Sequence, residues 1–223
     1  MSKSPFTFLT IFLLISFFAS SQENIIQSDT LFTPNYPEGI YATKSDFINK
    51  SPSSSAPVFL VGLLEDLESD ESIVHNPYFY YKKDEKKVKN VFAISFKGHL
   101  YFQIKAILKN RNKNDKAQST SYPNTFVRVI IGGENYYYTE AELANKWATG
   151  TAVNFGAVGG IIAEDLIKGK GIVWDFKNQE FNIFKSCEDY NEFITNIYPD
   201  GIQECNDHQP NPFRVREVIS IIK

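Results

Sequence analysis

The chain has 223 residues, of which 23 are Lys or Arg and 26 are Asp or Glu, so its formal net charge at pH 7 is −3. So mild a balance argues against a nucleic-acid-binding protein and against a strongly acidic one. The length is enough for one large domain or two small ones, with a hydrophobic core that needs no disulfides.

The first 21 residues have the pattern of a secretory signal peptide. Lys3 supplies a positive charge, residues 6–18 form an apolar run, and the small residues 19–21 suit cleavage before Gln22. The alternative is a membrane anchor, but crossing a bilayer takes about 20 apolar residues and this run is shorter. We therefore expect an exported protein that resides in the periplasm, on the cell surface or in the medium.

Removal of residues 1–21 leaves 22 basic and 26 acidic residues, a net charge of −4. In this mature chain, residues 22–35 are polar and predict a flexible leader. Residues 36–223 predict a single β-rich globular domain. No stretch of the mature chain is apolar over enough residues to predict a transmembrane helix.

A short capped helix is expected near the start of the domain. Thr43 and Asp46 have the spacing of a capping box, in which each side chain accepts a hydrogen bond from the other residue's backbone. Phe47 gives the helix an apolar side chain to bury. Pro52 ends it, because proline disfavours helical backbone in the residue before it. The stretch therefore predicts the first structural element of the domain rather than a binding site.

The middle of the chain predicts antiparallel strands, because it is dense in Phe, Tyr, Val and Ile, which favour pleated backbone. The expected strands are 57–64, 78–82, 91–96, 99–105, 126–131, 135–139, 171–177 and 180–185. Three hairpins follow, with turns at 97–98, 132–135 and 178–179. Both faces of the first hairpin are apolar, so we expect it to lie centrally and to be covered on both sides.

The register of the last hairpin can be predicted from its side chains. With a two-residue turn at 178–179, Lys177 faces Glu180 and Trp174 faces Ile183. One face then collects the apolar side chains Ile172, Trp174, Phe176, Phe181 and Ile183. A slip of one residue would destroy this sorting, so the pattern favours the register.

Helices are expected mainly in the second half of the chain. Thr139 can cap a helix that ends at Gly150, and Ser186 can cap another over 187–197. Asn211, which is followed by a proline, begins the last one. Hairpins with peripheral helices predict an α+β fold on a meander of antiparallel strands, and the alternative is an eight-stranded β-barrel.

A set of short segments runs from the opening helix to a glycine-rich stretch near residue 160. The segments are Gly39-Ile40-Tyr41, Asp46-Phe47, Lys50-Ser51-Pro52, AISFKGHLYF, VRVIIGGENYYYTE and FGAVGG. Together they resemble an uncharacterised family of exported proteins from Bacteroidetes-type bacteria, a domain of unknown function. The resemblance implies a bacterial envelope location and carries no activity, ligand or catalytic residue.

The two cysteines, Cys187 and Cys205, permit one disulfide in an exported chain. Such a bond would contribute roughly 3 kcal/mol on the chain-entropy model. The alternatives are two buried free thiols or, with His208 three residues after Cys205, a zinc site. No second paired motif strengthens the zinc reading, so we expect the disulfide and no metal.

Motifs that would indicate catalysis are missing from the sequence. The histidines His75, His99 and His208 are isolated, and there is no serine-hydrolase elbow, zinc-protease motif or phosphate-binding glycine loop. The run Tyr136, Tyr137 and Tyr138 resembles a sugar-stacking platform, but strand alternation puts at most two of them on one face. We therefore expect strand core there, no cofactor, and a protein that is not an enzyme.

Two basic segments, 82–89 and 109–116, flank the arms of the first predicted hairpin and are expected to emerge together at its open end. Their charged groups are Lys82, Lys83, Lys86, Lys87, Lys89, Lys109, Arg111, Lys113 and Lys116, against three acids. The resulting +6 leaves −10 on the rest of the mature chain. This basic tip suits lipopolysaccharide phosphates, acidic glycans or an acidic protein partner, and the alternative is two solvated loops.

The leading hypothesis is therefore a non-catalytic envelope or secreted protein that acts by binding or packing. One alternative is a β-barrel carrier of a small apolar ligand. The other is a hydrolase whose site assembles from scattered residues such as His99 and His208.

Overall fold

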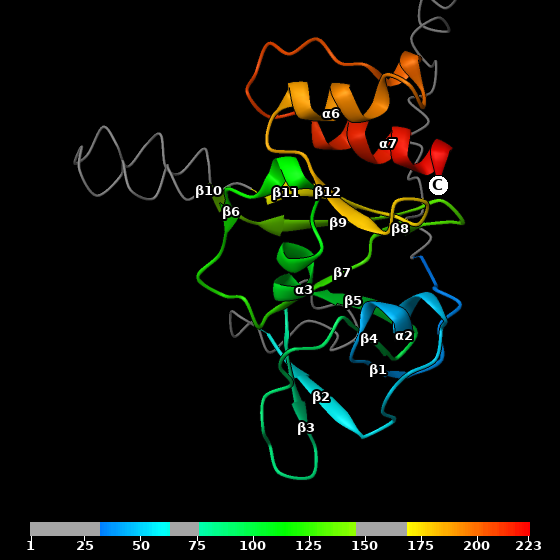
Figure 1. Cartoon of the computed structure of the whole chain (residues 1–223), viewed down its shortest axis with the longest axis vertical. Helices are drawn as coiled ribbons and strands as arrows, with labels where there is room; N and C mark the ends of the chain where they lie inside the picture. The colour runs from blue at the N-terminus through cyan, green and yellow to red at the C-terminus, as the bar shows by residue number, and fades with distance from the viewer. Residues whose placement is uncertain (1–31, 63–75, 146–168) are drawn as a thin grey trace, which may run out of the picture. The chain divides into compact units, whose positions relative to one another are not determined.

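Two four-stranded antiparallel sheets lie at the centre of the structure, a computed structural model that describes residues 32–62, 76–145 and 169–223 (Figure 1). The first sheet has the order β1-β4-β5-β7, formed by β1 (Gly39–Tyr41), β4 (Ala93–Phe96), β5 (His99–Gln103) and β7 (Phe126–Arg128). The second has the order β12-β11-β9-β8, formed by β12 (Glu180–Ile183), β11 (Gly169–Asp175), β9 (Tyr136–Glu142) and β8 (Ile131–Gly132). The described residues belong to one unit, which spans Leu31–Lys223.

Two strand pairs and several helices accompany these sheets. The pairs are β2 (Val58–Val61) with β3 (Tyr78–Tyr81), and β6 (Gln118–Ser119) with β10 (Ala144–Asn145). The α-helices are α2 (Lys44–Ile48), α3 (Ile104–Lys109), α6 (Cys187–Ile194) and α7 (Pro212–Ile222), and the 3-10 helices are η1 (Lys113–Asp115) and η2 (Pro199–Gly201). The predicted antiparallel α+β fold is confirmed, and the described strands do not close into the alternative barrel.

The predicted strand 126–131 is divided between the two sheets. Its first part is β7 and its last residue begins β8. The amide of Val129 donates to the Leu100 carbonyl of the first sheet, whereas the next amide, that of Ile130, donates to the Tyr138 carbonyl of the second. The chain therefore passes from one sheet to the other between these two residues, which the apolar run of the sequence does not reveal.

The β4–β5 hairpin has the predicted two-residue turn. Phe96 pairs with His99, and both turn residues, Lys97 and Gly98, have positive φ. Positive φ at both positions is the geometry that matches the right-handed twist of the strands. Each face of the hairpin borders its own cluster of buried side chains, so the prediction of a central hairpin covered on both sides is confirmed.

The β11–β12 hairpin has the predicted faces but not the predicted register. Asp175 pairs with Glu180 and Trp174 with Phe181, so the register differs by two residues and the turn has four residues, 176–179. The cause is the carboxylate of Asp175, which accepts hydrogen bonds from the backbone and side-chain amides of Asn178 and stabilises the longer turn. A shift of two residues keeps every side chain on its face.

The space between the two sheets is filled by aromatic side chains. Phe47 of α2 lies at their centre, with its ring 4.9 Å from that of Tyr36, 5.0 Å from that of Phe92 and 5.7 Å from that of Trp174. The predicted capping box of α2 is present, with Thr43 and Asp46 bonded reciprocally. The opening helix is thus a structural element, as predicted, and it places one phenylalanine in the core.

Each sheet is covered on its other face. Helices α6 and α7 lie beside the second sheet (Figure 1). Their side chains Tyr190, Ile194 and Val218 are buried in one cluster with Tyr138 and Val173 of that sheet. The β2–β3 pair buries Phe79 against Tyr101 and neighbouring residues of the first sheet. The layers therefore run from helices through two sheets to a two-stranded outer layer.

Of the three helices predicted in the second half of the chain, two are present. Ser186 caps α6 and Asn211 caps α7, as expected. Thr139 instead lies inside β9, because its strand pairs along its whole length with β11, so the predicted cap at this residue is wrong. The remainder of that predicted helix, 146–150, lies outside the described residues.

The predicted signal peptide, 1–21, and most of the leader, up to residue 31, lie outside the described residues. The ring of Phe32 lies 5.2 Å from that of Tyr137, and Pro34 is buried, so this part of the leader packs against the domain. No helix among the described residues has the length and apolar character to span a membrane.

Candidate anion-binding surface

The first basic segment, 82–89, extends the β2–β3 pair into a ribbon of three extended segments. The Tyr81 amide donates to the Lys86 carbonyl over 3.0 Å, and the Val88 amide donates to the Phe79 carbonyl over 2.8 Å. The turn between them is held by the Asp84 carboxylate, which accepts from the Lys86 amide. We call this structure, β2, β3 and residues 82–89, the basic ribbon.

Alternation along the ribbon separates its two faces. The inward side chains Val58, Phe79 and Val88 are buried on the first sheet. Their neighbours in sequence therefore point the other way. These outward side chains form what we call the ring face, which consists of Phe59, Val61, Tyr78, Tyr80 and Lys87.

The ring face is an ordered array of half-buried aromatic rings with a cation among them. The rings of Phe59 and Tyr80 lie 5.6 Å apart at an interplanar angle of 22°. The Lys87 ammonium lies 3.4 Å from the centroid of the Tyr78 ring and 5.6 Å from that of Tyr80. Val61 at the margin is 43% exposed. Cation–π attraction of this kind holds the ammonium beside the rings instead of leaving it free in water.

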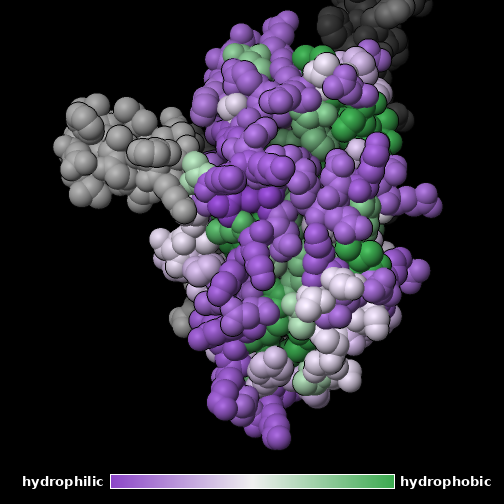
Figure 2. Space-filling view, in the orientation of Figure 1, coloured by the Kyte–Doolittle hydropathy of each residue, from purple (hydrophilic) through white to green (hydrophobic). Residues whose placement is uncertain are grey.

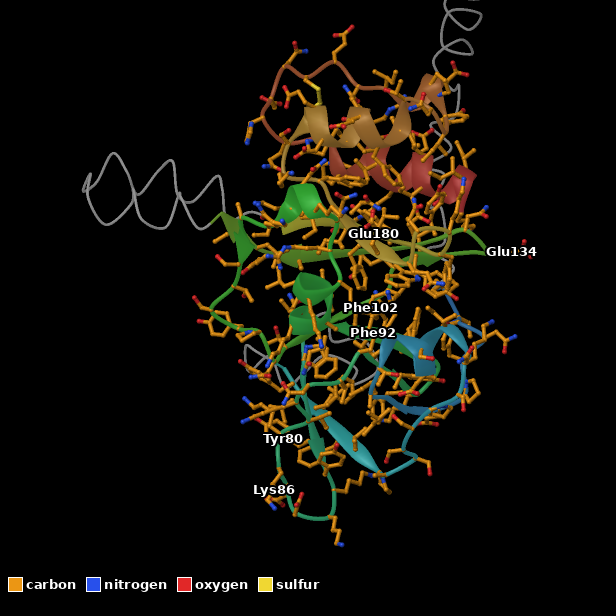
Figure 3. The ribbon with its side chains drawn as sticks, viewed as in Figure 1. Tyr80, Lys86, Phe92, Phe102, Glu134 and Glu180 are labelled. Atoms are coloured by element: carbon orange, nitrogen blue, oxygen red, sulfur yellow. A yellow bond between two sulfur atoms is a disulfide. The ribbon has the colours of Figure 1, made fainter. Side chains whose placement is uncertain are left out.

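The margin of the ring face is strongly basic. Lys82, Lys83, Lys86 and Lys89 of the adjoining segment are exposed. The segment 82–89 contains five lysines and two acids, a net charge of +3 in a chain whose net charge is −3. Lys86 pairs with Asp84 over 3.1 Å, and its hydrogen bond lowers the pKa of that carboxyl. In Figure 2 hydrophilic residues lie at the tip of this end of the molecule, next to residues of intermediate hydropathy, and Figure 3 shows Tyr80 and Lys86 near each other on the ribbon.

The second basic segment, 109–116, does not join the first at a common tip. Helix α3 follows β5 directly, and the chain beyond it lies along the edge of β12, where the Asn112 amide donates to the Phe181 carbonyl over 2.8 Å. Arg111 is used internally, since its guanidinium donates to the carbonyls of Leu108 and Lys116. The expectation of one tip assumed a strand where α3 forms, so the nine basic residues belong to two separate elements.

Three of the basic residues in the second segment, Lys109, Lys113 and Lys116, are nevertheless exposed. Asp115, between them, is buried and pairs with Lys185 over 2.8 Å, while its other oxygen accepts from the Ile183 amide. Burial raises the pKa of the Asp115 carboxyl, although the hydrogen bond from Lys185 opposes the rise. The segment is thus anchored on the second sheet through Asp115, with its three lysines exposed.

A buried lysine was missed by the sequence analysis. Lys170 in β11 is 2% exposed, and its ammonium donates to Oε1 of Gln118 over 2.8 Å. Burial lowers its pKa to about 8. The signal was available, because Lys170 precedes Ile172 and Trp174 at the two-residue spacing that places all three on the apolar face.

The remaining candidate residues take structural roles. Cys187 and Cys205 form the predicted disulfide, with Cα atoms 5.5 Å apart, so neither thiol can bind zinc. No group of three potential metal ligands occurs within residues 32–62, 76–145 and 169–223. His99 is half-buried, and burial followed by the charge of Arg128 lowers its pKa. His75 lies outside the described residues.

The tyrosine run is part of the interior, as predicted. Tyr137 faces the aromatic core between the sheets, while Tyr138 is buried on the other face and donates to Glu140 over 2.8 Å. Tyr136 packs against Phe193 of α6. An array of aromatic rings lies instead on the basic ribbon, for which the sequence pattern predicted a strand and a charged segment but no ring surface.

Comparisons of the chain with protein-family models, with curated proteins and with solved structures found no match. The resemblance to an exported Bacteroidetes family therefore stays a prediction.

Proposed function

We propose that this is an exported, non-catalytic binding protein that docks on anionic material of the cell envelope through the basic ribbon. The observation that carries the proposal is the concentration of positive charge on one ordered element of an otherwise acidic chain. Four exposed lysines share the segment 82–89 with Lys87, and the ribbon's inward face is fixed to the first sheet. A charged surface on a rigid base keeps its arrangement when a ligand binds, which lowers the entropic cost of association.

Export is the second part of the proposal. It is supported by the signal-peptide pattern of residues 1–21 and by the disulfide, a bond that persists in oxidising compartments. In the envelope, the phosphates of lipopolysaccharide and the acids of surface glycans are the abundant anions that such a ribbon would meet. The proposed location is the periplasm, the cell surface or the surrounding medium.

The test is binding of the mature chain, residues 22–223, to lipopolysaccharide and to an acidic polysaccharide. Binding is measured in about 0.01 M and about 1 M salt, where the Debye length is roughly 30 Å and 3 Å. We expect binding in low salt that is lost in high salt. The triple variant Lys83→Gln, Lys86→Gln and Lys89→Gln is expected to weaken it at least tenfold, because charge attraction between exposed groups is what the variant removes.

A matched control changes the same charge elsewhere. The variant Lys109→Gln, Lys113→Gln and Lys116→Gln removes three exposed lysines from the second segment and should bind like the wild type. Equal weakening by both triple variants would show that binding depends only on net charge. The ribbon would then not be the binding surface. Absence of binding by the wild type in low salt would end the proposal.

The two alternative functions differ in what supports them. The carrier hypothesis depended on a closed β-barrel, which the described strands do not form. The hydrolase hypothesis needs a nucleophile and a base in contact. His99 lies on the first sheet, whereas the His208 carbonyl accepts a hydrogen bond from the Cys187 amide at the start of α6. The two histidines therefore belong to different parts of the fold.

A further inference from the structure

We infer that the ligand of the basic ribbon is an acidic polysaccharide, whose sugar rings pack on the ring face while its acidic groups pair with the surrounding lysines. The inference rests on the proposed function and narrows its ligand class. Its starting point is the set of residues on the outward face of the ribbon, which attraction of anions by charge does not explain. A surface that attracts anions only by charge needs lysines, whereas here aromatic rings occupy three of the four outward positions of the paired strands, and the fourth is Val61.

The ring face is wider than a single ring, although the face of Tyr78 is occupied by the Lys87 ammonium. Tyr78 and Tyr80 are two residues apart on β3, which separates their Cβ atoms by about 7 Å along the strand. Phe59 lies across from Tyr80 on the neighbouring strand, with its ring nearly parallel to that of Tyr80. The array is therefore extended in two directions, like the repeating units of a chain.

Aromatic faces have a definite chemical preference. The face of a tyrosine or phenylalanine ring is electron-rich and attracts the weakly positive C–H groups of an apolar or sugar surface, as well as cations. The Lys87 ammonium makes such a cation–π contact with the Tyr78 ring. A pyranose presents C–H groups on its faces and hydroxyls on its rim, so it can cover Tyr80 and Phe59 while its rim stays in water.

The lysines then select for an acidic sugar over a neutral one. The Lys87 ammonium lies within the ring face, 5.6 Å from the centroid of Tyr80, where a carboxylate or sulfate on a stacked sugar would meet it. Lys83, Lys86 and Lys89 are exposed around the ribbon and could pair with the following units of the polymer. A lipid phosphate or an acidic peptide would use these charges but would leave the rings without a partner.

The experiment separates the contribution of the rings from that of the charges. Affinities of the mature chain are measured for polygalacturonic acid, neutral dextran, polyglutamate and phosphatidylglycerol vesicles. Two variants, Tyr80→Leu and Phe59→Leu, remove a ring but keep an apolar side chain in the ribbon. Tyr122→Leu is the control, because Tyr122 is 52% exposed and lies outside the ribbon. Thermal unfolding of each variant verifies that it is folded.

We expect polygalacturonic acid to bind most tightly, and each ribbon variant to weaken it roughly five- to tenfold, the factor that corresponds to one aromatic contact of about 1 kcal/mol or slightly more. Tyr122→Leu should have no effect. Binding of vesicles or polyglutamate should be weaker and unchanged in the ring variants. Dextran should bind most weakly, since it lacks the acidic groups.

Two results would overturn the inference and leave the proposed function standing. One is wild-type affinity of Tyr80→Leu and Phe59→Leu for polygalacturonic acid while the Lys83, Lys86 and Lys89 triple variant still loses binding. The other is tighter binding of vesicles or polyglutamate than of the polysaccharide. If none of the anions binds in low salt, the inference and the proposed function both fail.

Discussion

Lys170 and Gln118 lie in direct contact in the interior, where the lysine ammonium donates to the glutamine Oε1 over 2.8 Å. Each residue is at most 2% exposed. The amide nitrogen of Gln118 has no hydrogen-bond partner among the described residues. A charged group with so few partners is costly to bury, which is why the pKa of Lys170 falls to about 8.

This pair predicts an unusual dependence of stability on pH. Well below pH 8, Lys170 is protonated in both the folded and the unfolded chain. It therefore does not make the free energy of unfolding depend on pH there. Between pH 8 and its unfolded value of 10.5, the unfolded chain holds the proton and the folded chain does not, so stability rises with pH. We expect a gain of roughly 1–3 kcal/mol between about pH 7.5 and 9.5, measured by urea unfolding.

The variant Lys170→Met should lose this gain, whereas Lys113→Met, which changes an exposed lysine, should keep it. Above pH 10, stability should instead fall as the pH rises. Burial raises the pKa of Tyr41 and Tyr101 to about 12, so unfolding in this range releases their protons. A wild-type stability that falls steadily from pH 7.5 to 9.5 would contradict the prediction.

The aromatic core predicts a large effect at one position. Phe47→Ala removes a fully buried ring that contacts Tyr36, Phe92 and Trp174 from the short helix α2. The expected loss is about 3–5 kcal/mol of unfolding free energy, since neighbouring rings on two sheets cannot collapse into the cavity. Phe213→Ala, at a residue that is 73% exposed, should change it by less than about 0.5 kcal/mol. Equal effects would show that α2 does not insert into the core.

The disulfide predicts a difference between oxidised and reduced protein. It joins the first residue of α6 to the loop that precedes α7, with a sequence separation of 18. The double variant Cys187→Ser and Cys205→Ser should lose about 3 kcal/mol, because the unfolded chain regains the entropy that the closed loop removes. Reduction of the wild type should produce the same loss. No change in the urea midpoint on reduction would argue that the bond is absent in solution.

The signal-peptide pattern of residues 1–21 predicts a defined cleavage product. Export of the full chain should yield a mature protein that begins at Gln22, which N-terminal sequencing or intact mass identifies. Replacing the small residues Ala19 and Ser21 by leucine should block cleavage and leave the precursor. Retention of residues 1–21 on the exported wild type would instead support the membrane-anchor alternative.

Local features of the fold were readable from the sequence. The capping box of Thr43 and Asp46, the turn at Lys97 and Gly98, and the proline after Asn211 each specify a short stretch by its own chemistry. The two faces of the last hairpin were also correct, because alternation depends on parity alone. Its register was missed because the Asp175 carboxylate, a side-chain group, decides the length of the turn.

Features that depend on distant residues were not readable. The passage between the sheets at Val129 involves carbonyls of Leu100 and Tyr138, which no local pattern connects. The ring face was missed for a similar reason. The tyrosines of 78–81 suggested only a strand, and their orientation became defined when Phe79 was placed against Tyr101. The predicted basic tip is thus reduced to the segment 82–89, whose lysines remain a candidate site. The aromatic rings beside this segment were not predicted from the sequence.

The adjacent amides of Val129 and Ile130 are bonded to different sheets, so neither sheet can separate from the other without disrupting one of these bonds. The consequence is mechanical coupling, in which local opening of one sheet is transmitted to the other. In an amide hydrogen-exchange experiment, both residues should exchange only through global unfolding, at a common and very slow rate. The two sheets would then behave as one cooperative unit, to which the buried inward face of the basic ribbon is attached.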